Sequence, residues 1–228
     1  MNNDILLKIE NCIRNKETSL NLSGLNLKYI PKEINKLTHL KRLYLSDNKI
    51  IKIENLHNLP NLIELDLSIN EISSINGIEE LINLKRLDLS YNQLSRLSGR
   101  IKSLYSLEIL SLINNNIELS SDIKNLKELK NLFRLELSGN QLQELNVFKD
   151  EEFLINLKEL FVQHNKLVFM TIDFSKLQRI DFVNLCYNNS LIPRDIANNL
   201  CIIAGNTMLT DEFLHNVTLF LKRYHVYE

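Results

Sequence analysis

The sequence lacks the short motifs on which most catalytic and metal-binding proteins depend. It contains no phosphate-binding loop, no G-x-G-x-x-G, no H-E-x-x-H and no C-x-x-C, and its five histidines are far apart. The formal net charge is −1 and there is no basic stripe, which argues against nucleic acid as a partner. No run of about 20 apolar residues is present, so we expect no membrane span. These absences predict no cofactor, no bound metal ion and no catalytic residues.

Cysteine is also scarce. The three cysteines, Cys12, Cys186 and Cys201, are scattered and do not form a paired framework, which indicates a reducing compartment. The N-terminus lacks the basic segment and the apolar core of a secretory signal. We therefore expect a cytoplasmic protein, or one carried into a host cell without a Sec-type signal.

What the sequence does contain is a leucine frame that recurs and ends in asparagine. A large apolar residue stands eight, five and three positions before each asparagine, as Leu40, Leu43 and Leu45 do before Asn48. The copies recur at intervals of 22 to 25 residues. The asparagines that end them are Asn48, Asn70, Asn92, Asn115, Asn140, Asn165 and Asn188. A fixed period of about 20 to 29 residues with this frame is the pattern of a stacked solenoid.

The frame resembles the leucine-rich repeat family over residues 17–206. The resemblance implies an α/β horseshoe, with a parallel sheet on the concave face and short helical or 3₁₀ turns on the convex face. A degenerate unit at Leu20 and Leu22 begins the array, and another at Ile203 and Asn206 closes it, giving eight or nine repeats. The 22-residue units are similar to a short-repeat subclass typified by a phosphatase regulatory subunit.

The residue pattern leads to the same architecture independently of the family. Leucines that alternate with polar residues predict strands with one buried face. An asparagine side chain carries donors and an acceptor. We expect each one to bond backbone groups of its own coil and of the next coil, which would otherwise be buried unpaired. The apolar residues that follow at every third position, such as Ile50, Ile53 and Leu56, predict short 3₁₀ or helical turns.

The two ends of the array need cover, because an open solenoid end exposes its core. Residues 4–15 place Ile5, Ile9 and Cys12 on one helical face, which predicts an N-terminal cap helix within residues 1–16. A membrane-surface helix is the alternative, but it would need a basic polar face, and this one mixes both signs of charge. An apolar helical stripe after Thr210 predicts a second cap over residues 207–228. We expect one leucine-rich repeat domain, 1–228, and a monomer.

The residues between and after the leucines are predicted to form a concave face that binds a protein partner. The predicted partner-binding residues are Arg42, Tyr44, Glu64, Asp66, Arg86, Asp88, Tyr91, Ile109, Ile113, Arg134, Glu136, Glu159, Phe161, His164, Phe182 and Tyr187.

This set divides into a charged part and an apolar part. In the charged part Asp66 and Asp88 should be neighbours, and like charges that face each other are unfavourable unless arginines offset them. Two interpretations stay open there: an ion network that is complete in itself, and a surface that meets a partner. In the apolar part Phe161 is expected to contact a partner, since exposed clustered aromatics mark interaction sites. Phe182 and Tyr187 would be covered instead if the C-terminal helix folds back over them.

Together these features predict a non-catalytic protein-interaction scaffold. Two other functions remain open: a regulatory subunit or inhibitor of an enzyme, similar to the phosphatase regulators, and a bacterial effector delivered into a host cell. Enzymatic activity is the least supported class. A nucleophilic Cys186 would need a base within reach, and none stands in register with it.

Overall fold

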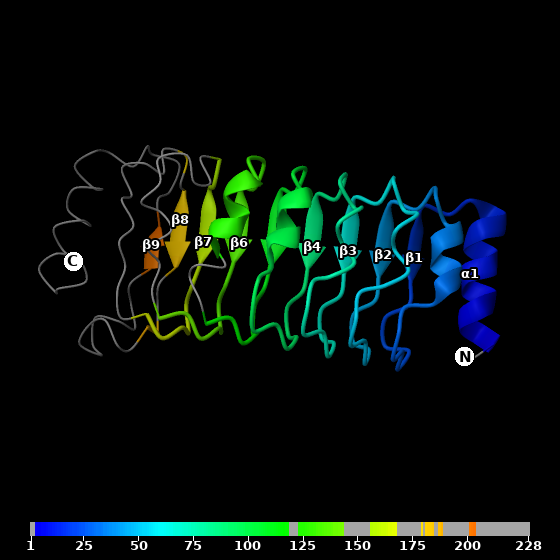
Figure 1. The fold of residues 1–228 in the computed structure, drawn as a ribbon, viewed down its shortest axis with the longest axis horizontal. Helices are drawn as coiled ribbons and strands as arrows, with labels where there is room; N and C mark the ends of the chain where they lie inside the picture. The colour runs from blue at the N-terminus through cyan, green and yellow to red at the C-terminus, as the bar shows by residue number, and fades with distance from the viewer. Residues whose placement is uncertain are drawn as a thin grey trace, which may run out of the picture.

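The computed structural model describes residues 3–118, 123–143, 156–167, 179, 181–184 and 187–188, together with the backbone of 201–203. The predicted helix over residues 207–228 and the side chains of Cys186 and Cys201 lie outside this range. The described chain begins with helix α1 (Asn3–Asn15) and continues as an elongated stack of short strands in one sheet, ordered β1 to β9 (Figure 1).

Each strand is three residues long and spans the alternating part of the leucine frame. The strands are β1 (Ser19–Asn21), β2 (Arg42–Tyr44), β3 (Glu64–Asp66), β4 (Arg86–Asp88), β5 (Ile109–Ser111), β6 (Arg134–Glu136), β7 (Glu159–Phe161), β8 (Phe182–Asn184) and β9 (Cys201–Ile203).

Strands β1 to β8 pair in parallel, and every pairing joins equivalent positions of the frame. Leu43 lies opposite Leu65, and Leu65 lies opposite Leu87. This register continues from β1 to β8 without a slip. Recurrence along the sequence therefore corresponds to adjacency in space, which confirms the predicted solenoid.

The last strand differs from the prediction. Strand β9 pairs with β8 in the antiparallel direction, with Val183 opposite Ile202. Of the eight or nine repeats predicted, eight strands form the parallel array, and the ninth unit does not continue it. The step from Asn188 to Asn206 is shorter than the other steps in the sequence, and a short step leaves less chain for the return that a parallel strand requires.

One continuous core runs through the stack. The frame leucines from Leu20 to Leu160, with Val162 and Val183, are buried, and so are the apolar residues of the returning segments. The central residue of each strand from β1 to β8, such as Leu65 in β3, is buried in this core, while its two neighbours are at least partly exposed in nearly every one of these strands. A one-residue slip would turn every leucine outward, which fixes the register strongly.

Within the residues that the structure describes, 3₁₀ helices occur in some of the returning segments. They are η1 (Lys32–Lys36), η2 (Gly99–Ser103) and η3 (Lys124–Glu128). In the units that follow Asn48 and Asn70 the chain makes isolated turns instead, such as the bond from the Leu59 amide to the Leu56 carbonyl at 3.3 Å. The predicted short helical or 3₁₀ turns are therefore present, in some units as a 3₁₀ helix and in others as a single hydrogen-bonded turn, which is enough to bury the apolar residues.

Helix α1 lies against the N-terminal end of the sheet, where it contacts β1 and η1 (Figure 1). Its buried residues are Ile5, Ile9 and Cys12. The Cys12 thiol donates to the Glu17 carbonyl at 3.3 Å. Burial, and then the negative charge of Glu17, raises the pKa of Cys12, so this thiol stays protonated and unreactive. Among the described residues, no helix has the length and apolar character needed to cross a membrane.

Candidate functional site: the outward face of the sheet

The asparagine ladder sets the spacing of the coils. In a central coil, the Asn92 Nδ2 donates to the carbonyls of Leu67, Leu89 and Ser90 at 2.9, 3.1 and 3.2 Å, and its Oδ1 accepts from the Ile72 amide at 2.9 Å. All seven ladder asparagines are buried. The Ile72 amide finds its partner in Asn92, and the Leu67 carbonyl accepts from both Asn70 and Asn92, at 3.0 and 2.9 Å.

The direction of these bonds corrects the prediction. Besides its own coil, each described ladder side chain from Asn48 to Asn165 bonds the coil that precedes it, as Asn92 does with Leu67 and Ile72. The side chain turns back toward the carbonyl that directly follows the previous strand, and the carbonyl at the same position of its own coil accepts from two asparagines, its own and the next. Asn115 covers Leu89 in this way, at 2.9 Å.

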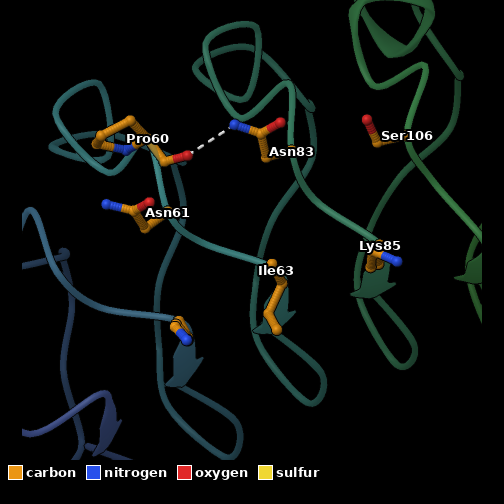
Figure 2. Close-up of a pocket in the computed structure, with 7 residues that line it drawn as sticks. Pro60, Asn61, Ile63, Asn83, Lys85 and Ser106 are labelled. Atoms are coloured by element: carbon orange, nitrogen blue, oxygen red, sulfur yellow. Dashed lines mark hydrogen bonds between the residues drawn. The ribbon is translucent and has the colours of Figure 1, made fainter.

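A second set of asparagines forms side-chain hydrogen bonds to the preceding coil, at positions just before a strand. Asn83 donates to the Pro60 carbonyl at 2.8 Å (Figure 2). The members of this set, each nine positions before a ladder asparagine, are Asn61, Asn83, Asn131 and Asn156. The sequence carries the signal for this set, which is an asparagine directly before the first leucine of the frame. Ser106 takes the equivalent place in the coil between Asn83 and Asn131 and borders an open hollow of about 330 Å³, also lined by Lys41 and Lys85.

The turn after each strand contains a residue in the left-handed conformation. This column is Gly24, Asp47, Ile69, Tyr91, Asn114, Gly139, His164 and Tyr187, with φ between 50° and 69°. Gly, Asn and Asp adopt this region readily, whereas it is unfavourable for a β-branched residue such as Ile69. Three residues predicted for the concave face, Tyr91, His164 and Tyr187, thus lie at the rim of the sheet and not on its strands.

The other predicted residues lie on the outward side of the strands, apart from Ile113, which follows β5. The outward strand residues form two columns, and within each column a residue lies opposite the next one on the neighbouring strand. The first column consists of Arg42, Glu64, Arg86, Ile109, Arg134, Glu159 and Phe182. The second consists of Tyr44, Asp66, Asp88, Ser111, Glu136 and Phe161. Arg86 is exposed, Ser111 is buried and the rest are half-buried. We call these two columns the sheet face.

Two of the three arginines of the sheet face, Arg86 and Arg134, form ion pairs with glutamates. Arg86 Nε lies 3.8 Å from Glu64 Oε1, and Arg134 Nε lies 2.9 Å from Glu136 Oε1 and 3.1 Å from Glu159 Oε2. Burial, and then the charge of Glu64, raises the pKa of Tyr44, whose hydroxyl also hydrogen-bonds that glutamate. Part of the predicted ion network is therefore neutralised within the sheet face.

Asp88 is the exception within this network. Its Oδ1 accepts from the Ser90 amide at 2.9 Å. Burial raises the pKa of Asp88, the hydroxyl and amide of Ser90 oppose that rise, and the charges of Asp66 and Glu136 add to it. The like-charge neighbourhood that was predicted for Asp66 and Asp88 is thus present, and the arginines do not remove its effect.

The far end of the sheet face is aromatic. The rings of Phe161 and Phe182 lie 5.0 Å apart between centroids and are tilted by 39°, and the Arg134 guanidinium lies 5.1 Å from the Phe161 centroid. At the rim the rings of His164 and Tyr187 stack at 4.3 Å. Aromatic residues and arginine thus cover three adjacent strands, with both phenylalanine rings half-buried.

Family models identify the repeats. The model described as Leucine Rich repeats (2 copies) matches residues 38–80, and the one described as Leucine Rich Repeat matches residues 83–104. Residues 38–104 are leucine-rich repeats. No curated protein matches the chain.

Three solved structures resemble the leucine-rich repeat stack. Internalin C2 from Listeria monocytogenes is 27% identical with a TM-score of 0.66, over 80% of this chain and 76% of its own. Internalin F from the same organism is 18% identical with a TM-score of 0.51, over 81% and 75%. The plant peptide hormone receptor RGFR1, solved in complex with RGF2, is 24% identical with a TM-score of 0.58, over 69% of this chain and 26% of the receptor. The shared feature is the leucine-rich repeat solenoid.

The chemistry available on this leucine-rich repeat face is that of recognition. Within the described residues no three His, Cys, Asp or Glu side chains are arranged to hold a metal ion. The sheet face instead offers fixed carboxylates, two neutralised arginines and a half-buried aromatic pair on a rigid scaffold. Of these groups, arginine and the aromatic residues are the ones enriched at protein interfaces.

Proposed function

We propose that this protein is a non-catalytic scaffold that binds a partner protein across the sheet face of its leucine-rich repeats. The observation that carries the proposal is the cluster of Arg134, Phe161 and Phe182, which brings an arginine and two aromatic rings together on the outward side of adjacent strands. Such clusters contribute most of the binding energy at protein interfaces.

The rigidity of the stack supports the same proposal. Each strand is fixed by its neighbours and by a buried asparagine, so the face is already ordered before a partner arrives. Binding to an ordered surface loses little backbone entropy. We further propose that the protein acts as a monomer in a reducing compartment, which the free, buried thiol of Cys12 supports.

Affinity capture with matched variants tests the proposal. We expect Phe161→Ala to lower retention of the partner about 30-fold, which corresponds to a hot-spot contribution of about 2 kcal/mol. Tyr105→Ala is the control, because Tyr105 is an exposed aromatic outside the strands. The proposal fails if both variants lose the partner equally. It also fails if Phe161→Ala lowers the melting temperature so far that unfolding accounts for the loss of binding.

A further inference from the structure

The sheet face contains a hollow that the ion network does not fill. It measures about 130 Å³ and is lined by Arg86, Asp88, Ile109, Ser111, Arg134 and Glu136. The register explains it, because the small residue Ser111 stands between Asp88 and Glu136 on neighbouring strands. The hydroxyl of Ser111 forms a 2.7 Å hydrogen bond with the hydroxyl of Ser90, which keeps the Ser111 side chain buried. The floor of the hollow is thereby held open between two carboxylates.

The lining of the hollow carries two arginines and two carboxylates, but the sheet face around it has an excess of negative charge. The strands β2 to β7 present three arginines and five carboxylates on the sheet face, an excess of two negative charges. Arg86 and Arg134 are engaged by Glu64, Glu136 and Glu159. Within the part of the chain that the structure describes, no ion pair joins Asp66 or Asp88 to a cation. The raised pKa of Asp88 has the same origin, since burial and two neighbouring carboxylates act on it.

We propose that this hollow receives the lysine or arginine side chain of an extended partner segment, whose next large apolar residue lies over Phe161 and Phe182. The inference rests on the proposed function, because it names the chemistry of the partner that binds the sheet face. A cation placed between Asp88 and Glu136 would offset the excess negative charge in a partly desolvated site, where charge-assisted hydrogen bonds are stronger. The volume corresponds to about four water molecules, which suits an ammonium or guanidinium group.

The geometry also sets the spacing within that segment. The hollow is centred on β5, and the aromatic pair joins β7 and β8. Parallel strands lie about 4.8 Å apart, so the two features are separated by about 12 Å. An extended chain advances about 3.3 Å per residue, so the basic and apolar residues should be three to four positions apart. The segment would run across the strands, along the long axis of the stack.

Selection from a displayed library of random heptapeptides on the full-length protein tests the inference. We expect peptides selected by the wild type to be enriched in Lys or Arg, with a large apolar residue three or four positions away. Asp88→Asn keeps the size of the side chain and its bond to the Ser90 amide but removes the charge, and should reduce the affinity of those peptides at least tenfold. Asp47→Asn, an acidic residue of the rim in a conformation that asparagine tolerates, should leave it unchanged.

The outcomes separate this inference from the proposed function. Selected peptides without a basic residue, or basic peptides that bind Asp88→Asn as tightly as the wild type, overturn the hollow as a cation site. So does a dimer of this chain, seen by sedimentation, that Asp88→Asn abolishes, since a second copy would then occupy the hollow. In each case the proposed function stands if capture of the partner protein still depends on Phe161, and it fails separately if that capture does not.

Discussion

One asparagine side chain in each coil bonds backbone groups of two coils. Asn92 makes four such bonds, and every partner lies in the interior of the stack, where no water competes. An apolar residue of similar size fills the same space, leaves the Ile72 amide unpaired and removes one of the two side-chain donors from the Leu67 and Leu89 carbonyls. The cost of a buried polar group without a partner, about 1–3 kcal/mol, decides the residue type at this position.

We therefore expect Asn92→Leu to lower the free energy of unfolding by about 1–3 kcal/mol or more, measured by urea denaturation. Asn83→Ala is the control, because Asn83 is exposed and its side chain donates one hydrogen bond, to the Pro60 carbonyl of the preceding coil. The control should cost less than about 1 kcal/mol. Equal losses in the two variants would show that burial does not set the value of the ladder bond.

Asp88 illustrates the opposite situation, a charge that the fold disfavours. Burial and two neighbouring carboxylates, opposed by Ser90, raise its pKa above the usual 3.8. The folded state then holds the Asp88 proton more tightly than the unfolded state does. Stability contributed by this group is therefore present at low pH and is lost as the pH rises from 3.8 through the raised value.

It follows that Asp88→Asn should unfold at higher urea concentration than the wild type near neutral pH. The difference should shrink as the pH falls through the window between the usual and the raised pKa, because the wild-type carboxyl then becomes protonated. Denaturation midpoints measured at several pH values check this. A difference that stays constant with pH, or a less stable variant at neutral pH, would contradict the assignment.

At the scale of elements, the stack depends on what covers its end. Strand β1 has a neighbouring strand only on the β2 side, and helix α1 supplies the missing contacts on the other. Ile9, on the face of α1 that is turned to the stack, is 1% exposed, whereas Leu7 on the opposite face of the helix is 55% exposed. The hydrophobic face of α1 is therefore part of the core of the repeats.

Ile9→Ala should accordingly destabilise the protein by about 2–5 kcal/mol, the range for truncating a buried isoleucine or leucine. Leu7→Ala should change stability by less than about 0.5 kcal/mol, as is usual for exposed positions. Thermal unfolding of the two variants decides between them. If Ile9→Ala proved as mild as Leu7→Ala, α1 would be a helix that rests on the stack without sealing it.

At the scale of the whole molecule, interactions are confined to neighbours. Among the described elements, the main contacts join each strand to the strands beside it, α1 to β1 and η1, and η2 to η3 in the adjacent coil. Stability in such arrays is a sum of repeat terms and interface terms, and opening begins at the ends. The central coils, which have intact neighbours on both sides, open last.

Hydrogen exchange should reveal this gradient. We expect the amides of Leu67 and Leu89, bonded to the next strand at 2.9 Å, to exchange more slowly than the Leu22 amide, which is bonded at 2.8 Å near the N-terminal end. The bond lengths are alike, so position in the stack is the variable. Uniform protection across the three would indicate that the described repeats open as a single cooperative unit.

The sequence by itself determined the period, the direction of the leucines and the ladder of asparagines. A repeat that contacts only its neighbours converts spacing along the chain into adjacency in space, so Leu43, Leu65 and Leu87 could be aligned without coordinates. The columns of the sheet face followed from the same register. Expectations about a cap helix over residues 207–228 stay predictions.

Only the tertiary structure decided the details that depend on three dimensions. The asparagines bond the preceding coil, the left-handed turns carry Tyr91 to the rim, and β9 reverses its direction. Arg134 lies within reach of two glutamates and a phenylalanine, and its contacts leave the hollow beside Asp88 unfilled. A repeat pattern fixes which residues are neighbours. It does not fix which neighbour a long side chain chooses, because that choice depends on distances, burial and charge in the folded molecule.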